Sequence, residues 1–178
     1  MPIYLEPKDV STELENYRSV LFVCCPMCPP MSLAMQTKKP FVEVVKHGLK
    51  TEVFDDYVQS IRGPLEQRGV RTEILSMRWP LPLICLWTEG QRKRLAERAR
   101  DFEAVLVFGC NSATDTIEDI LKDSDCDVIQ AMRMRGIAHA TTKFGFPLKV
   151  GFDVHPMRKK RKAGQNEQPA DDGPSATL

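Results

Sequence analysis

The sequence has no hydrophobic run long enough to cross a membrane. Its longest apolar stretches are Val20–Cys25 and Leu81–Trp87, whereas a transmembrane helix needs about 20 consecutive apolar residues. The N-terminus also has no basic segment followed by an apolar core, as a secretory signal would. We therefore expect no membrane span and a cytoplasmic protein, in which cysteines remain thiols or metal ligands.

The sequence also has almost no excess of either charge. It contains 25 basic and 24 acidic residues among 178, a formal net charge of +1. A nucleic-acid-binding domain usually carries a clear positive excess, so we expect no nucleic-acid partner. Hydrophobic residues at 42% and charged residues at 28% are ordinary values for a globular protein, and they exclude a wholly disordered chain.

Large apolar side chains are nearly missing from the end of the chain. Residues 156–178 contain a run of five basic residues, Arg158 to Lys162, followed by small and polar residues. Such a segment cannot build a core, so we expect a disordered tail there and a single domain over residues 1–155. The basic run either solubilises the chain or contacts phosphates or an acidic partner.

Short apolar runs alternate with amphipathic segments through most of the remaining chain. The pattern predicts strands at 20–24, 70–75 and 104–108 and from 127, and helices at 53–65, 92–100 and 111–121. Such alternation is typical of an α/β domain with a mainly parallel sheet, either flavodoxin-like or Rossmann-like. The runs at 20–24 and 104–108 are wholly apolar, as expected of strands buried on both faces.

The pattern changes after residue 136. Residues 137–143 and 148–154 flank a turn at Phe144-Gly145-Phe146-Pro147. They predict a two-stranded antiparallel extension at an edge of the sheet, with Pro147 at the turn rather than inside a strand. Alternation predicts that one set of side chains in the second strand faces inward: Leu148, Val150, Phe152 and Val154.

A long insertion follows the first predicted strand. Residues 29–51 contain Pro29, Pro30 and Pro40, which we expect to prevent a continuous helix in the first part of the insertion. A long segment after the carboxyl end of a parallel strand is often functional, because open α/β sheets bind ligands at that edge.

Cysteines gather after two of the predicted strands. Cys24 ends the run at 20–24 and is followed by Cys25 and Cys28, and Cys110 follows the run at 104–108. If these strands are neighbours, as in a flavodoxin-like sheet, both cysteine sites open into one crevice. Cys126, at the start of a later strand, is expected to pack as a small apolar residue.

One interpretation of these cysteines is a metal site or an iron–sulfur cluster. Cys25 and Cys28 have the two-residue spacing with which two thiolates bind one metal ion or cluster. Cys24, Cys110 and Cys85 are the candidates that complete the ligand set.

A second interpretation is a redox-active dithiol. The segment Cys25-Pro26-Met27-Cys28 resembles the CPxC active-site motif of glutaredoxin-like proteins, although the following Pro29-Pro30 departs from that pattern. A CxxC pair near a helix start favours thiol–disulfide exchange. The resemblance implies a catalytic role for Cys25 and Cys28, and Cys110 is a third catalytic candidate at the same edge.

A third interpretation is a small-molecule enzyme. The segment from Gly109 to Ala113 (GCNSA) resembles the CNTA segment of aspartate/glutamate racemases, and this implies that Cys110 acts as an acid/base or a nucleophile. Independently of the resemblance, Asn111, Ser112 and Thr114 stand at a predicted helix start, where backbone amides bind anions. The same residue types also serve as plain helix caps.

The segment Trp79–Trp87 is apolar and interrupted by prolines. It either covers the crevice or forms a patch that docks a protein partner or a second copy of the chain. The sequence therefore predicts a cytoplasmic redox protein with an iron–sulfur cluster or a dithiol. The alternatives are an enzyme that uses Cys110 and a non-catalytic subunit of a redox complex.

Overall fold

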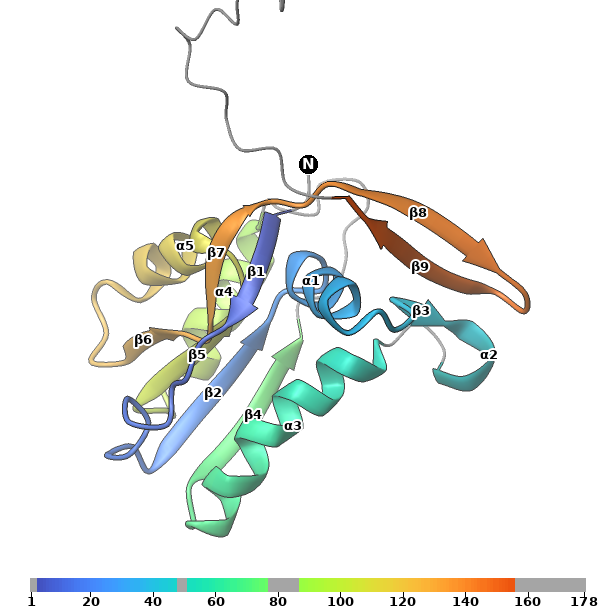
Figure 1. The fold of residues 1–178 in the computed structure, drawn as a ribbon. Coiled ribbons are helices and arrows are strands. Elements are labelled where there is room, and N and C mark those ends of the chain that lie inside the picture. The colour runs from blue at the N-terminus through green and yellow to red at the C-terminus, as the bar shows by residue number, and fades with distance from the viewer. Residues whose placement is uncertain (1–2, 48–50, 77–86, 156–178) are drawn as a thin grey trace, which may run out of the picture.

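The computed structural model describes residues 3–47, 51–76 and 87–155. Its centre is a parallel sheet with the strand order β4-β2-β5-β6 (Figure 1). The strands are β2 (Ser19–Cys24), β4 (Arg71–Ser76), β5 (Ala104–Phe108) and β6 (Asp127–Gln130). Each neighbouring pair in this sheet is parallel. The predicted α/β class with a mainly parallel central sheet is therefore confirmed.

Two pairs of helices cover this sheet. Helix α1 packs against α3, and α4 packs against α5, and the two pairs lie on opposite faces (Figure 1). Their bounds are α1 (Cys28–Thr37), α3 (Glu52–Gln67), α4 (Glu89–Ala99) and α5 (Asn111–Leu121), and a short helix α2 (Val44–His47) precedes α3. Within the described ranges, no helix is long and apolar enough to cross a membrane.

The two wholly apolar strands form the centre of the core, as predicted. Every residue of β5 is fully buried, and so are the apolar residues of β2. The ring of Phe108 lies 5.5 Å from Phe22 and also contacts Phe54 and Tyr57 of α3. Phe108 therefore faces the side of the sheet that α3 covers.

Local sequence signals set several of the helix ends. The backbone N–H of Gln91 donates to the Thr88 hydroxyl, and the Thr88 N–H donates to the Gln91 side chain, so the predicted capping box of α4 is present. Helix α3 is followed by Gly69 at φ +81°, a conformation that glycine adopts without steric cost.

Helix α1 corrects the prediction that prolines break the start of the 29–51 insertion. The helix begins at Cys28, and Pro29 and Pro30 lie in its first turn. N–H groups in the first turn have no acceptor within the helix, so proline removes no hydrogen bond there. Pro40 lies beyond the helix, which ends at Lys38 in a left-handed conformation (φ 55°).

Antiparallel pairs flank the central sheet. The strand β1 (Ile3–Pro7), which the sequence pattern did not reveal, pairs with β7 (Met132–Ile137). The predicted hairpin is present as β8 (Ala140–Gly145) and β9 (Lys149–Val154), with a cis Phe146–Pro147 bond in its turn. It does not extend the parallel sheet, because it joins β3 (Val42–Glu43) in a separate three-stranded sheet with the order β3-β9-β8.

The side chains expected to face inward from this hairpin do so only in part. Val150 and Phe152 are half-buried, and the Phe152 ring lies 5.5 Å from Phe41. Leu148 and Val154 are 67% and 49% exposed. The prediction was wrong for these two because Leu148 lies in the turn before β9, with φ 50°, and Val154 is the last residue of the strand.

Candidate thiol site at the carboxyl edge of the sheet

The two cysteine sites of the sequence lie at the same edge of the sheet. Strands β2 and β5 are direct neighbours, and their register sets Cys24 opposite Phe108. One residue further, the backbone N–H of Cys25 donates to the Phe108 carbonyl oxygen at 2.9 Å. The pairing therefore continues past the strand end and brings Cys25 level with Gly109, the residue before Cys110.

Gly109 is where helix α5 approaches the strand end most closely. A Cβ atom added at Gly109 would lie 2.8 Å from the Cβ of Ala113 and 3.2 Å from a methyl group of Val107. The same added atom would lie 3.9 Å from the Cβ of Cys25. Cys25 therefore borders the gap between the strand end and α5, and only a residue without a side chain fits beside it.

The thiols at this edge differ in their access to solvent. Cys24, Cys28 and Cys110 are buried, whereas Cys25 is half-buried. These three and Cys25 are thiols in the structure. A thiol must be reached by its substrate in order to react, so Cys25 is the best placed of the four to make the first contact.

Cys24 lies on the other face of the sheet and is poorly suited to chemistry. Burial raises the pKa of Cys24 to about 12, and the negative charges of Asp55 on α3 and of Cys25 add to this effect. Thiolates, not thiols, act as nucleophiles and metal ligands. At neutral pH Cys24 is therefore protonated and belongs to the core under α3.

Two helices begin at this edge. Cys28 is the first residue of α1, and Cys110 is the N-cap of α5 in an extended conformation. The N-terminal end of a helix carries a partial positive charge, which stabilises anions within the first turn. Neither helix has an acidic side chain in its first turn. A thiolate or a substrate anion within the first turn of either helix would therefore be stabilised by that helix end.

The predicted anion-binding side chains of α5 are partly used by the fold. The Thr114 hydroxyl donates to the Cys110 carbonyl oxygen at 3.4 Å, and the Asn111 side-chain oxygen accepts from Gln130 at 3.1 Å. Ser112 is exposed in the first turn. Hydrogen bonds within the protein therefore occupy the Asn111 side-chain oxygen and the Thr114 hydroxyl, whereas the exposed Ser112 remains available to a ligand.

The predicted metal ligands are brought together only in part. In the three described ranges, no group of three or more His, Cys, Asp or Glu side chains is arranged to hold a metal ion. Cys85 falls outside those ranges. Cys126 directly precedes β6, at the amino end of that strand, and packs against the core as expected. Burial and the neighbouring Asp127 raise its pKa to about 11.

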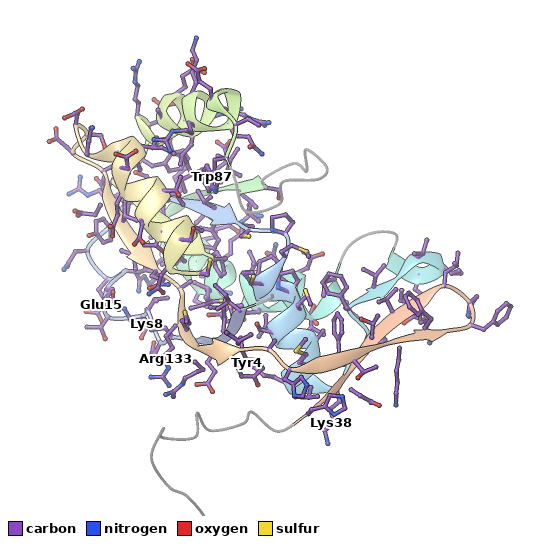
Figure 2. All side chains as sticks on the ribbon, turned by 90° about the horizontal axis from the view of Figure 1, so that it is seen from above. Tyr4, Lys8, Glu15, Lys38, Trp87 and Arg133 are labelled. Carbon is purple, nitrogen blue, oxygen red and sulfur yellow. The ribbon has the colours of Figure 1, made fainter. Side chains whose placement is uncertain are left out.

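The predicted docking segment Trp79–Trp87 also lies outside the described residues, apart from Trp87. Trp87 is half-buried and packs against the hydrophobic core just before α4 (Figure 2). Its indole therefore stabilises the domain, whatever the rest of the segment does.

In comparisons with protein-family models, with curated proteins and with solved structures, nothing matches this chain.

Proposed function

We propose that this protein is a cytoplasmic thiol-based redox protein in which Cys25 and Cys28 form and reopen a disulfide. The observation that carries the proposal is the 2.9 Å hydrogen bond from the Cys25 N–H to the Phe108 carbonyl oxygen. It fixes the half-buried Cys25 at the carboxyl edge of the sheet, three residues before the N-terminal residue of α1.

The strand order supports a ligand site at this edge. We infer that the fold is flavodoxin-like, because the order β4-β2-β5-β6 places the first of these four strands in the chain between the second and the third. Open α/β sheets of this kind bind ligands at the carboxyl ends of the strands, where the order reverses. That point lies between β2 and β5, beside Cys25 and Cys110.

The reaction moves two electrons between the protein and a disulfide. The Cys25 thiolate attacks one sulfur of a substrate disulfide, which gives a mixed disulfide and releases one thiolate that takes up a proton. The Cys28 thiolate then attacks the Cys25 sulfur, which closes the Cys25–Cys28 disulfide and releases the second thiolate. A thiol or dithiol reductant reverses the change in the protein.

The structure offers two features that assist these steps. The start of α1 stabilises negative charge on the sulfur atoms beside it. Cys28 is the first residue of that helix, and the first turn of a helix opens more easily than its middle. In the proposed reaction, local opening of this first turn brings Cys28 to Cys25 while the rest of α1 stays folded.

A dithiol fits the described residues better than a cluster. Iron–sulfur clusters are held by four ligands, mostly cysteine thiolates. Within the described ranges no three candidate ligands converge, and the raised pKa of Cys24 disfavours its thiolate. The proposed reaction therefore uses the Cys25 and Cys28 thiols alone.

A second candidate function uses Cys110 as an acid/base or a nucleophile. It is favoured by the position of Cys110 as the N-cap of α5, with the exposed Ser112 in the first turn of that helix. In this function a carboxylate or phosphate would bind at the helix start, and Cys110 would be the reacting group. Loss of activity in Cys110→Ser alone would distinguish it from the dithiol function.

The dithiol function is tested with a small disulfide such as glutathione disulfide. Cys25→Ser should abolish the reduction of this substrate, and Cys28→Ser should trap glutathione on Cys25, detected as an added mass on the Cys25 peptide. Cys126→Ser is the matched control and should retain activity. Trapping of glutathione on Cys110 instead, with Cys25→Ser still active, would refute the assignment.

A further inference from the structure

A second feature of the molecule lies at the opposite end of α1 from the cysteines. A groove of about 930 Å³ runs between the end of α1 and the β8–β9 hairpin. Figure 2 shows Lys38 at that end of the helix, beside the base of the hairpin. Helix α1 has 10 residues and so is ~15 Å long at 1.5 Å per residue. The groove is therefore separate from the thiol site.

The groove is lined by positive charge. Four lysines border it, namely Lys38, Lys39, Lys143 and Lys149, and Asp153 is the one acidic residue among the described lining residues. Lys143 pairs with Asp153 at 2.5 Å, and Lys149 pairs with Glu43 at 2.9 Å. Lys38 and Lys39 form no ion pair with any residue in the described ranges. Their charges are available to an anionic ligand.

Lys38 is the C-cap of α1, and its backbone N–H donates to the Ala34 carbonyl oxygen. It ends α1 with φ 55°, in the left-handed region. Glycine or asparagine usually occupies this position, because a longer side chain is strained there. Lysine is therefore an unusual residue for this helix end, and here it lines the groove.

Aromatic rings accompany the lysines. Phe144, Phe152 and Tyr4 line the groove. Phe144 is 83% exposed, and Phe146 in the adjoining turn is 96% exposed. Two phenylalanine rings so open to water contribute little to the stability of the domain. Exposed aromatic rings beside a positively charged groove are the features on which single-stranded bases stack.

The chain continues from this groove into its most basic segment. His155 lines the groove, and the run of five basic residues from Arg158 to Lys162 begins three positions later in the sequence. The near-zero net charge of the whole chain conceals this clustering, because acidic residues elsewhere balance it. The expectation of no nucleic-acid partner depended on that total and not on the local distribution.

We propose that the groove between α1 and the β8–β9 hairpin binds single-stranded nucleic acid. Lys38 and Lys39 contact the phosphates, and Phe144 and Phe146 stack on unpaired bases. Single strands fit because their bases are accessible to stacking, whereas the bases of a duplex are not. An acidic protein segment would use the lysines but would gain no stacking on the two rings.

The test measures fluorescence anisotropy of labelled oligo(dT) and oligo(U), each about 15 nucleotides long, with the full-length protein. Binding should weaken steeply between ~50 and ~200 mM salt, because counterions are released when lysines contact phosphates. The double variant Lys38→Ala/Lys39→Ala should weaken binding at least tenfold and flatten this salt dependence. The matched control Lys93→Ala/Lys122→Ala removes two exposed lysines from other surfaces and should leave binding unchanged.

A second variant tests stacking separately from charge. Phe144→Ala/Phe146→Ala removes two exposed rings, so the protein should stay folded and should lose binding by tenfold or more at every salt concentration. Replacement of residues 158–162 by serine should reduce the affinity for the oligonucleotide. In that serine variant, each of the two groove double variants should still weaken binding further.

Three results would overturn the proposal. The first is no binding of either oligonucleotide at ~50 mM salt. The second is binding that disappears with residues 158–162 and is insensitive to both groove variants. The third is equal competition by polyglutamate together with no effect of Phe144→Ala/Phe146→Ala, which would identify an acidic protein segment as the ligand.

Discussion

The Cys25 N–H donates to the Phe108 carbonyl oxygen at 2.9 Å, one step beyond the last residue pair of strands β2 and β5. This bond brings two distant cysteine segments to one edge of the parallel sheet. The consecutive residues Cys24 and Cys25 have different surroundings at this edge. Cys24 faces α3, whereas Cys25 borders Gly109 and α5.

Cys24 should resist alkylation in the folded protein. It should also cause the free energy of unfolding to fall as the pH becomes alkaline. Burial raises the pKa of Cys24 from 9.0 to about 12, so between these values the unfolded chain loses the proton and the folded protein keeps it. The stabilising contribution is therefore complete below pH ~9 and is lost as the pH rises toward ~12. Urea midpoints measured from pH 8 upward should fall with pH, and Cys24→Val should reduce the slope.

The control for this prediction is Cys126→Val, since the pKa of Cys126 is also raised, to about 11. It should reduce the slope over a narrower pH range than Cys24→Val. An unchanged slope in Cys24→Val, or rapid alkylation of Cys24 in the folded protein at neutral pH, would contradict the burial described for this thiol.

Gly109→Ala should disturb the approach of α5 to the sheet. The added Cβ would lie 2.8 Å from the Cβ of Ala113, and overpacking of this kind costs about 1–3 kcal/mol. Ala113→Gly should restore part of the loss in the double variant, which a double-mutant cycle in urea would measure. Gly90→Ala is the matched control, because a Cβ there meets nothing within 4 Å, and it should leave stability unchanged or slightly increased.

Much of the fold follows from sequence periodicity, and its exceptions have local causes. The apolar runs at β2 and β5 are buried on both faces, and the Thr88/Gln91 spacing does form a capping box. The prolines after Cys28 misled the prediction because their effect depends on where a helix begins, and the first turn tolerates them. The strand β1 is short and pairs with the distant β7, so no local pattern marks it.

The sequence was sufficient to predict which strand ends carry the candidate site. The sequence placed Cys25 and Cys110 after two apolar strands, but which face each cysteine occupies depends on register. Only the pairing of Cys24 with Phe108 assigns Cys24 to the α3 side. Gly109 and Ala113 are small residues four positions apart, and this spacing was the available sign of a close approach by α5.

Trp87→Ala should lower stability without changing the oligomeric state. The indole is half-buried and packs against the core, so we expect a loss of about 2 kcal/mol, below the range for a fully buried tryptophan. Thermal unfolding would measure the loss, and gel filtration would report the state of association. A variant of unchanged melting temperature that elutes as a smaller species would instead support docking through Trp79–Trp87.

Removal of residues 156–178 should leave the melting temperature nearly unchanged, because the segment contains too few large apolar side chains to contribute to a core. Scanning calorimetry of the full chain and of the chain ending at His155 provides the comparison. A drop of several degrees would show that the segment packs on the domain.

The most direct test of the central claim is a redox titration of the full-length protein followed by peptide mapping. Equilibration with glutathione buffers of increasing oxidising power should convert two thiols to one disulfide. Mass spectrometry should locate that disulfide between Cys25 and Cys28, and dithiothreitol should reopen it. Cys24 and Cys126 should remain thiols throughout. If Cys25 and Cys28 stay unlinked at every potential, or if the disulfide that forms joins other cysteines, the dithiol account is contradicted.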